Sequence, residues 1–90
     1  MANMILEFRV MPEDGDTEYS ELESQVRNVI ENYHESVKVR EIKAQSVGFG
    51  LQAVHINIEL DENCGSEDLE NKLIDIELAG EVNLLKMDRL

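Results

Sequence analysis

Two segments of the chain alternate between apolar and polar side chains, in residues 4–11 and in residues 51–60. A period of two puts every apolar side chain on one face of a strand, so each segment is predicted to be a strand with one buried face. The apolar positions are Leu6, Phe8 and Val10 in the first segment, and Val54, Ile56, Ile58 and Leu60 in the second. The remaining positions of the second segment are expected to point outward: Ala53, His55, Asn57 and Glu59.

Two further segments, residues 37–47 and 81–90, are also predicted to be strands. Residues 37–47 are rich in β-branched side chains, but the apolar parity slips between Val39 and Ile42. Such a slip indicates a bulge or bend. Residues 81–90 are predicted to form a last short strand that runs to the end of the sequence.

Residues 19–33 carry apolar side chains at helical spacing, namely Leu22, Val26, Val29, Ile30 and Tyr33. This spacing predicts a helix with one buried stripe. Ser20 and Glu23 could form a capping box at its start, and Asp16 or Thr17 is an alternative, earlier start.

Residues 67–78 are predicted to form a second helix, with Leu69, Leu73 and Ile76 on its buried side. Ser66 is expected to cap this helix, and the acidic residues that follow it suit the first turn. Gly80 is expected at the position that ends it.

The order strand-helix-strand-strand-helix-strand favours an α+β, ferredoxin-like β-α-β-β-α-β sandwich. In that plan a four-stranded antiparallel sheet carries both helices on one face. The 90 residues are expected to form a single domain, 1–90.

Charge narrows the possible partners. The chain has 20 acidic and 8 basic residues, a net charge of −12. Direct nucleic-acid binding is not expected, because phosphate contacts need clustered cations. The acidity favours solubility and could also steer a basic partner protein. No apolar run approaches the length that spans a membrane, and the single cysteine, Cys64, fits a reducing cytoplasm.

Signals for covalent chemistry or for a cofactor are weak. His34 and His55 stand 21 positions apart and are interpreted as surface histidines, and no phosphate loop or metal-binding pair is present. The acidic residues 12–18 lack the glycine and glutamate that a calcium loop requires, with Tyr19 and Gln25 in their places. We therefore expect no metal, no cofactor and no enzymatic reaction.

The segment Gly48-Phe49-Gly50 joins two predicted strands. A phenylalanine between two glycines at a bend could be an exposed anchor for a partner, or it could fold back over the sheet edge. The last residues raise a similar choice. Arg89 could simply balance charge at the chain end, or it could insert into a partner together with Met87, Asp88 and Leu90.

Three stretches carry a family resemblance across essentially the whole chain: "RVMPEDGDTE", "SVGFGLQAVHINIELDE" and "VNLLKMDRL". In this order and spacing they resemble archaeal elongation factor 1-beta and the guanine-nucleotide-exchange domain at the C-terminus of eukaryotic elongation factor 1-beta. The absence of an N-terminal scaffold domain favours the short archaeal form.

The resemblance implies a ferredoxin-like fold and exchange of GDP for GTP on elongation factor 1-alpha, the GTPase that delivers aminoacyl-tRNA. It implies that Phe49, presented by Gly48 and Gly50, helps to dock on the GTPase. It also implies that Arg89 disturbs the magnesium and phosphate site, with Met87, Asp88 and Leu90 in supporting contacts. The free protein is expected to be a monomer.

Two positions depart from the family pattern. The near-terminal cation is Arg89 where the family has lysine, so it could expel the metal or grip a carboxylate of the GTPase switch regions. Glu13 stands where the eukaryotic domain has tryptophan. Two other functions remain open, a small ferredoxin-like module that binds a regulatory ligand and a partner subunit without exchange activity.

Overall fold

The computed structural model describes residues 3–48, 50–64 and 67–89, and its elements follow the predicted order. They are β1 (Asn3–Pro12), α1 (Tyr19–Glu31), β2 (Lys38–Gly48), β3 (Leu51–Asp61), a short 3₁₀ turn η1 (Glu62–Cys64), α2 (Glu67–Ile74) and β4 (Ala79–Arg89).

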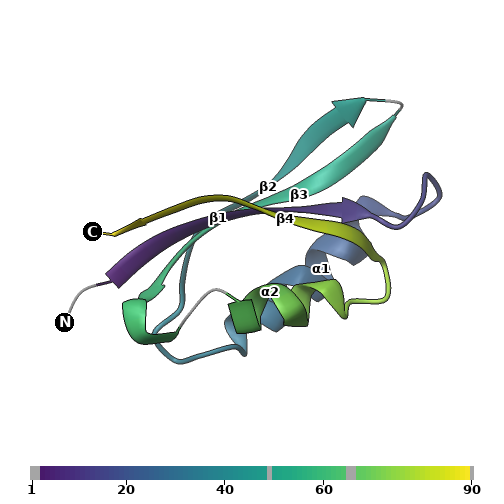
Figure 1. Ribbon diagram of the computed structural model, residues 1–90. Coiled ribbons are helices and arrows are strands. Elements are labelled where there is room, and N and C mark those ends of the chain that lie inside the picture. Colours follow the sequence, from purple (N-terminus) through teal and green to yellow (C-terminus); the bar gives the residue numbers. More distant parts are fainter. Residues whose placement is uncertain (1–2, 49, 65–66, 90) are drawn as a thin grey trace.

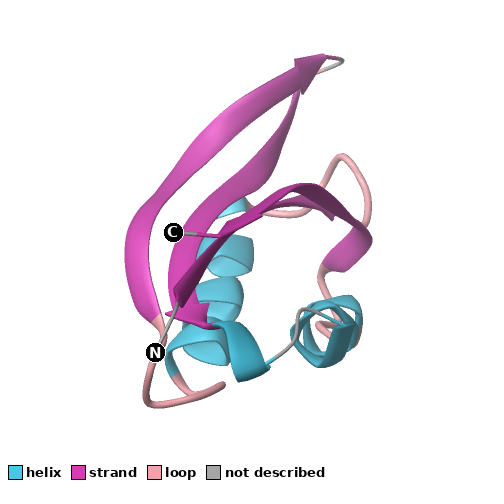
Figure 2. Ribbon diagram, turned by 60° about the vertical axis from the view of Figure 1, so that its left-hand side comes forward, coloured by secondary structure: helices cyan, strands magenta, loops and turns pink. Residues whose placement is uncertain are grey.

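The four strands form one antiparallel sheet in the order β2-β3-β1-β4. Both helices lie on the same face of this sheet, as Figures 1 and 2 show. The expected ferredoxin-like α+β fold is therefore confirmed. The side away from the helices is called the open face below.

The core lies between the sheet and the two helices. Every inward position predicted for the two alternating segments is fully buried, and so are three positions of α1 and two of α2. Burial of one such side chain stabilises the fold by about 1.5–3 kcal/mol. The fully buried large side chains are Leu6, Phe8, Val10, Leu22, Val26, Ile30, Val54, Ile56, Ile58, Leu60, Leu69 and Leu73.

Both edge strands contain a bulge. In β2 the pairing with β3 shifts between Val39 and Glu41, which confirms the predicted irregularity and leaves Arg40 as the extra residue. In β4 the pairing with β1 shifts so that Lys86 lies opposite Glu7 and Leu84 opposite Phe8, which leaves Leu85 as an extra residue. The second bulge was not predicted.

The first helix begins at Tyr19, as predicted, but the prediction of a capping box is wrong. The residue before α1 is Glu18, and no side chain caps the helix, so the Ser20–Glu23 capping box does not form. An earlier start is excluded as well, because Asp14 accepts hydrogen bonds from the Asp16 amide (2.9 Å) and the Thr17 hydroxyl (3.3 Å). These local bonds hold the acidic loop in a turn.

The predicted end of the second helix is also wrong. Helix α2 stops at Ile74, and Ile76 is buried from the turn that follows it. Gly80 lies within β4, where a Cβ atom would come within 2.7 Å of the Pro12 carbonyl oxygen. Gly80 therefore permits a close approach of two backbones and does not end a helix. Ser66 lies outside the described residues.

Two of the outward positions of β3 are less exposed than expected. Ala53 is fully buried although it faces the open side, where it pairs with Gln45 of β2. Its short side chain lies between longer neighbours. The His55 side chain is only 14% exposed, so of the two expected surface histidines only His34 is exposed.

Candidate functional site

The turn between β2 and β3 requires glycine for its backbone conformation. Strand pairing continues to Gly48 opposite Leu51, and Gly48 and Gly50 have φ angles of +93° and +75°. These values are unfavourable for residues with a Cβ atom. A Cβ atom at either position would meet nothing within 4 Å, so the requirement is conformational. Phe49 lies outside the described residues.

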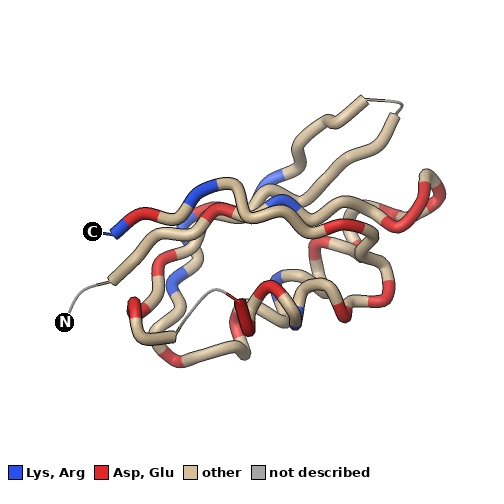
Figure 3. The backbone as a smooth tube through the Cα atoms, in the orientation of Figure 1, with Lys and Arg blue, Asp and Glu red and all other residues tan. Residues whose placement is uncertain are grey.

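The acidic loop that follows β1 flanks this hairpin. Its Gly15 lies close to Leu51, since a Cβ atom there would be 3.8 Å from the Leu51 Cδ2 atom. A small hollow of about 90 Å³ separates the loop from Gly50 and Gln52. The acidic residues of this loop are exposed, and the loop lies near the first residues of β3; Figure 3 shows its concentration of acidic positions.

The last part of β4 is exposed along its whole length, from Leu84 to Arg89. Arg89 lies opposite Met4 in the pairing with β1, on the side of the sheet that carries the helices. Its Nε atom is 3.6 Å from the Glu62 Oε2 atom of η1, and its side chain is 84% exposed. The cation is thus held loosely at the rim.

The neighbours of Arg89 complete this end of the strand. Met87 lies opposite Leu6 on the helix side and is 57% exposed. Lys86 and Asp88 point to the open face and form an ion pair at 3.3 Å. Leu90 lies outside the described residues.

The hairpin tip and the β4 terminus lie at opposite ends of the molecule. Strand β4 ends beside the start of β1, where Arg89 pairs with Met4, whereas the β2–β3 turn lies beyond the other end of β1. Figure 1 shows the separation along the long axis, which spans 42 Å. The candidate residues therefore form two separate sites, and a partner that uses both must span most of the molecule.

The charge of the protein is unevenly distributed between the layers (Figure 3). The strands hold six of the 8 basic and six of the 20 acidic residues, which leaves two basic and fourteen acidic residues in helices and loops. The charged strand residues are Arg9, Lys38, Arg40, Lys43, Lys86 and Arg89, and Glu7, Glu41, Glu59, Asp61, Glu81 and Asp88. The strands are thus neutral as a group, and the net charge of −12 resides in the helices and loops.

The open face carries polar atoms that are buried without a hydrogen-bond partner among the described residues. They are Arg9 Nε, Gln45 Oε1, His55 Nδ1, Asn57 Oδ1 and Asn83 Nδ2. Buried polar groups normally have partners. The same face holds an ion pair between His55 Nε2 and Glu7 Oε1 at 3.5 Å.

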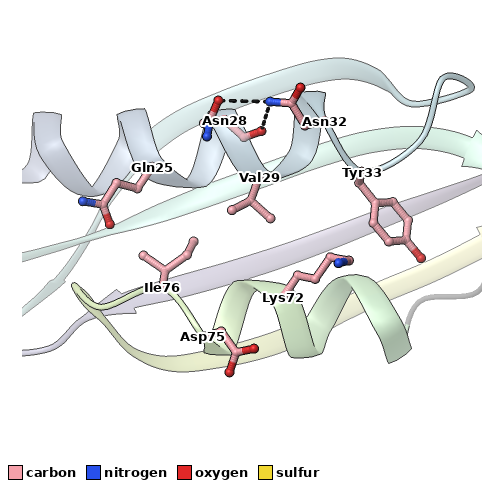
Figure 4. Close-up of a pocket in the computed structure, with 8 residues that line it drawn as sticks. All are labelled: Gln25, Asn28, Val29, Asn32, Tyr33, Lys72, Asp75 and Ile76. Atoms are coloured by element: carbon pink, nitrogen blue, oxygen red, sulfur yellow. Dashed lines mark hydrogen bonds between the residues drawn. The ribbon is translucent and has the colours of Figure 1, made fainter.

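An open groove of about 580 Å³ runs between α1 and α2 on the outer side of the helices (Figure 4). Its apolar part is formed by Val29 of α1 and by Ile76, which lies in the turn after α2. Lys72 of α2 and Asp75 of the same turn also line the groove. Asn32 donates a hydrogen bond to the Asn28 side chain at 3.0 Å. None of the residues expected from the sequence to contact the GTPase lines this groove.

The two tyrosines pack beside the core. Burial, and then the nearby Glu23 carboxylate, raises the pKa of Tyr19. Burial likewise raises the pKa of Tyr33, whose hydroxyl donates to the Cys64 carbonyl at 3.1 Å. Both phenols therefore stay neutral and act as structural groups.

Across residues 3–48, 50–64 and 67–89, no group of three or more His, Cys, Asp or Glu side chains is arranged to hold a metal ion. None of the helices there is both long enough and apolar enough to cross a bilayer.

Sequence reasoning missed two features of the β4 end. Leu84 and Leu85, which are 36% and 44% exposed, were assigned to a strand without regard to their exposure. The two consecutive leucines break strict alternation, and that signal could have revealed the bulge. The contact of Glu62 with Arg89 had no signal in the sequence, because the two residues meet only through strand pairing.

Comparison with known proteins identifies the family. A sequence model described as the EF-1 guanine nucleotide exchange domain matches residues 5–90. The chain belongs to this family.

Members of the exchange-domain family with similar sequences come from several organisms. The chain is 32% identical over 87 residues to elongation factor 1-beta of Caldivirga maquilingensis, which covers 93% of this chain and 91% of the relative. It is 30% identical over 84 residues to elongation factor 1-beta of Thermoplasma volcanium, with 92% of each chain covered. For elongation factor 1-beta of Methanocaldococcus jannaschii the identity is 26% over 88 residues, with 97% of each chain covered.

Proposed function

We propose that this protein is a translation elongation factor that promotes exchange of GDP for GTP on elongation factor 1-alpha. The observation that carries the proposal is the match of the exchange-domain family over residues 5–90. The relatives named above share nearly their full length with this chain. In this proposal residues 1–90 act as one exchange domain, without covalent chemistry.

The two ends of the molecule would have different roles. The hairpin tip, with Gly48 and Gly50 presenting Phe49, would anchor the factor on the GTPase. The β4 terminus would approach the nucleotide site. Arg89 would be the cation that acts there, with Met87, Asp88 and Leu90 in supporting contacts. A molecule 42 Å long can span two such regions of one partner.

Arg89 is suited to leave its present partner. Its contact with Glu62 is long, at 3.6 Å, and the arginine side chain is 84% exposed. An exposed ion pair contributes only about 0–1 kcal/mol, so breaking it on docking costs little. The freed guanidinium could then compete with Mg²⁺ beside the GDP phosphates, or it could pair with a switch-region carboxylate.

Exchange would follow from differential binding. A factor that binds the nucleotide-free GTPase more tightly than the GDP-bound GTPase must, by linkage, weaken the binding of GDP. A cation placed near the metal site supplies such a difference, because it is stabilised when Mg²⁺ leaves and repelled while Mg²⁺ stays.

The test is the release of fluorescent GDP from purified elongation factor 1-alpha in millimolar Mg²⁺, with this protein at substoichiometric concentration. We expect a large acceleration. Binding without acceleration would refute the proposed function and leave a partner subunit. An absence of binding would refute it as well.

Variants then test the residues. Arg89→Ala is expected to slow stimulated release about tenfold or more, corresponding to about 1.4 kcal/mol, with a smaller loss of affinity. Lys86→Ala is the matched control, because Lys86 is a cation on the same strand that points to the open face. Phe49→Ala is expected to weaken binding. Equal effects of the Arg89 and Lys86 variants would remove Arg89 from this role.

Removal of Mg²⁺ separates the two actions of Arg89. If the guanidinium opposes the metal, the defect of Arg89→Ala disappears when Mg²⁺ is chelated. If it grips a carboxylate, the defect persists without Mg²⁺.

A further inference from the structure

The two edges of the sheet differ in how they are protected. Strands β2 and β4 are the edge strands, and an unpaired edge is a template for another strand. The β2 edge carries the exposed cations Lys38, Arg40 and Lys43, which discourage pairing. The β4 edge instead carries three of the four large apolar side chains that are exposed among the described residues, Leu84, Leu85 and Met87.

These apolar side chains are exposed because the helices do not reach them. Leu84 and Met87 lie opposite the buried Phe8 and Leu6, on the helix side of the sheet. Helix α2 has only eight residues, and Figure 1 shows β4 running past it toward the end where the chain termini lie. The rim of the sheet is therefore apolar at a place that the protein itself leaves uncovered.

The bulge at Leu85 determines which part of the edge is regular. Beyond the bulge, Lys86–Arg89 pair with β1 without interruption, from Glu7 to Met4. A bulge turns an edge strand and limits pairing across it. The regular stretch Lys86–Arg89, with Leu85 at its start, is thus the part of β4 open to a new strand.

We propose that an extended segment of the GTPase partner, carrying apolar and acidic side chains, pairs with β4 along Lys86–Arg89 as a fifth strand. The identity of this partner rests on the proposed function. Backbone hydrogen bonds would supply affinity in this binding mode, and side chains would supply specificity. Apolar residues of the segment would cover Met87 and Leu85, and a carboxylate would replace Glu62 as the partner of Arg89.

Charge favours such a segment over a second copy of this chain. The stretch Lys86–Arg89 holds two cations and one carboxylate, in a protein whose net charge is −12. Antiparallel pairing of two β4 edges would put both α2 helices side by side on the same face. Helix α2 carries Glu67, Asp68 and Glu70 against the single Lys72, so this arrangement would be repulsive.

Hydrogen exchange tests the proposal directly. The full-length protein is compared alone and in complex with nucleotide-free elongation factor 1-alpha. Outward amides of Lys86–Arg89 are expected to exchange at least about tenfold more slowly in the complex, because new backbone hydrogen bonds protect them. Amides of the β2 edge that lie away from the hairpin tip, from Lys38 to Lys43, are expected to be unchanged.

A pair of variants supplies a second readout. Leu85→Lys is expected to weaken binding to the GTPase about tenfold, whereas Ile74→Lys is expected to have no effect. Ile74 is the matched control, since it is 50% exposed, against 44% for Leu85, and lies on α2.

The outcomes distinguish this proposal from the proposed function. Binding and accelerated GDP release without protection of β4 would overturn the fifth strand and leave the exchange function intact. An absence of both binding and acceleration would overturn both. Protection of β4 that grows with the concentration of this protein alone would show pairing between copies and overturn a GTPase segment as the occupant.

Discussion

Replacing Gly80 by alanine is expected to destabilise the fold through a clash between two backbones. The new Cβ atom would lie 2.7 Å from the Pro12 carbonyl oxygen and 3.2 Å from the Glu13 Cα atom. Contacts between carbon and carbonyl oxygen in sheets are usually about 3.3–3.6 Å. The start of the acidic loop would therefore have to move by roughly half an ångström, and it is held there by the Glu13 amide, which donates to the Leu78 carbonyl at 2.8 Å.

The expected cost combines two effects and one offset. Overpacking costs about 1–3 kcal/mol, and weakening the adjacent hydrogen bond costs up to about 1 kcal/mol. The substitution also reduces the conformational entropy of the unfolded chain, which offsets about 0.4–1 kcal/mol of this cost. We expect the free energy of unfolding to fall by about 1–3 kcal/mol, which lowers the midpoint of urea unfolding by roughly 1 M or more.

Gly15→Ala is the control for this prediction. A Cβ atom there would make only an ordinary contact, 3.8 Å from Leu51 Cδ2, so the variant should be as stable as the wild type or slightly more stable. Urea midpoints that coincide for the two variants would refute the clash at Gly80.

Three further predictions concern the turn, the core and the phenols. Gly50→Ala should lower the free energy of unfolding by about 1–2 kcal/mol because of its φ of +75°, and Gly50→Asn should lower it less; equal losses in urea unfolding would contradict this reason. Phe8→Ala should cost about 3–5 kcal/mol, since the ring is fully buried, and a loss below about 1 kcal/mol would argue against its place in the core. Burial raises the pKa of Tyr19, so its stabilisation is complete below the unfolded pKa of about 10 and is lost as the pH rises through the higher native pKa. Tyr19→Phe should therefore lose less stability than the wild type between pH 8 and pH 11, and parallel losses in urea unfolding would exclude Tyr19 as the group responsible.

The candidate site could be predicted only in part. Gly48 and Gly50 were recognisable as a turn because they stand between two predicted strands and glycine is typical of tight turns. The exposure of Arg89 followed from its position near the chain end. The separation of these residues at opposite ends of a 42 Å molecule was not predictable, because it depends on which strand lies next to which.

Local periodicity determined the elements and the inward faces. The alternation of Leu6, Phe8 and Val10, and the helical spacing of Leu22, Val26 and Ile30, each identify a buried side from the geometry of a single segment. Element order then restricted the topology to one with both helices on one face. Periodicity could not predict where α2 ends. Ile76 stands at helical spacing, but it reaches the core from the turn that follows the helix.

Only the tertiary structure shows what covers the apolar side of each strand. Leu84 and Met87 point to the same side as the core but remain exposed, because α2 is too short to cover them. Gly80 has the sequence context of a helix end, yet it serves a close contact with Pro12. The sequence by itself determined which side of each strand is apolar. Whether a helix, a neighbouring backbone or a partner covers that side is set by contacts between residues distant in the chain, and local patterns do not encode those contacts.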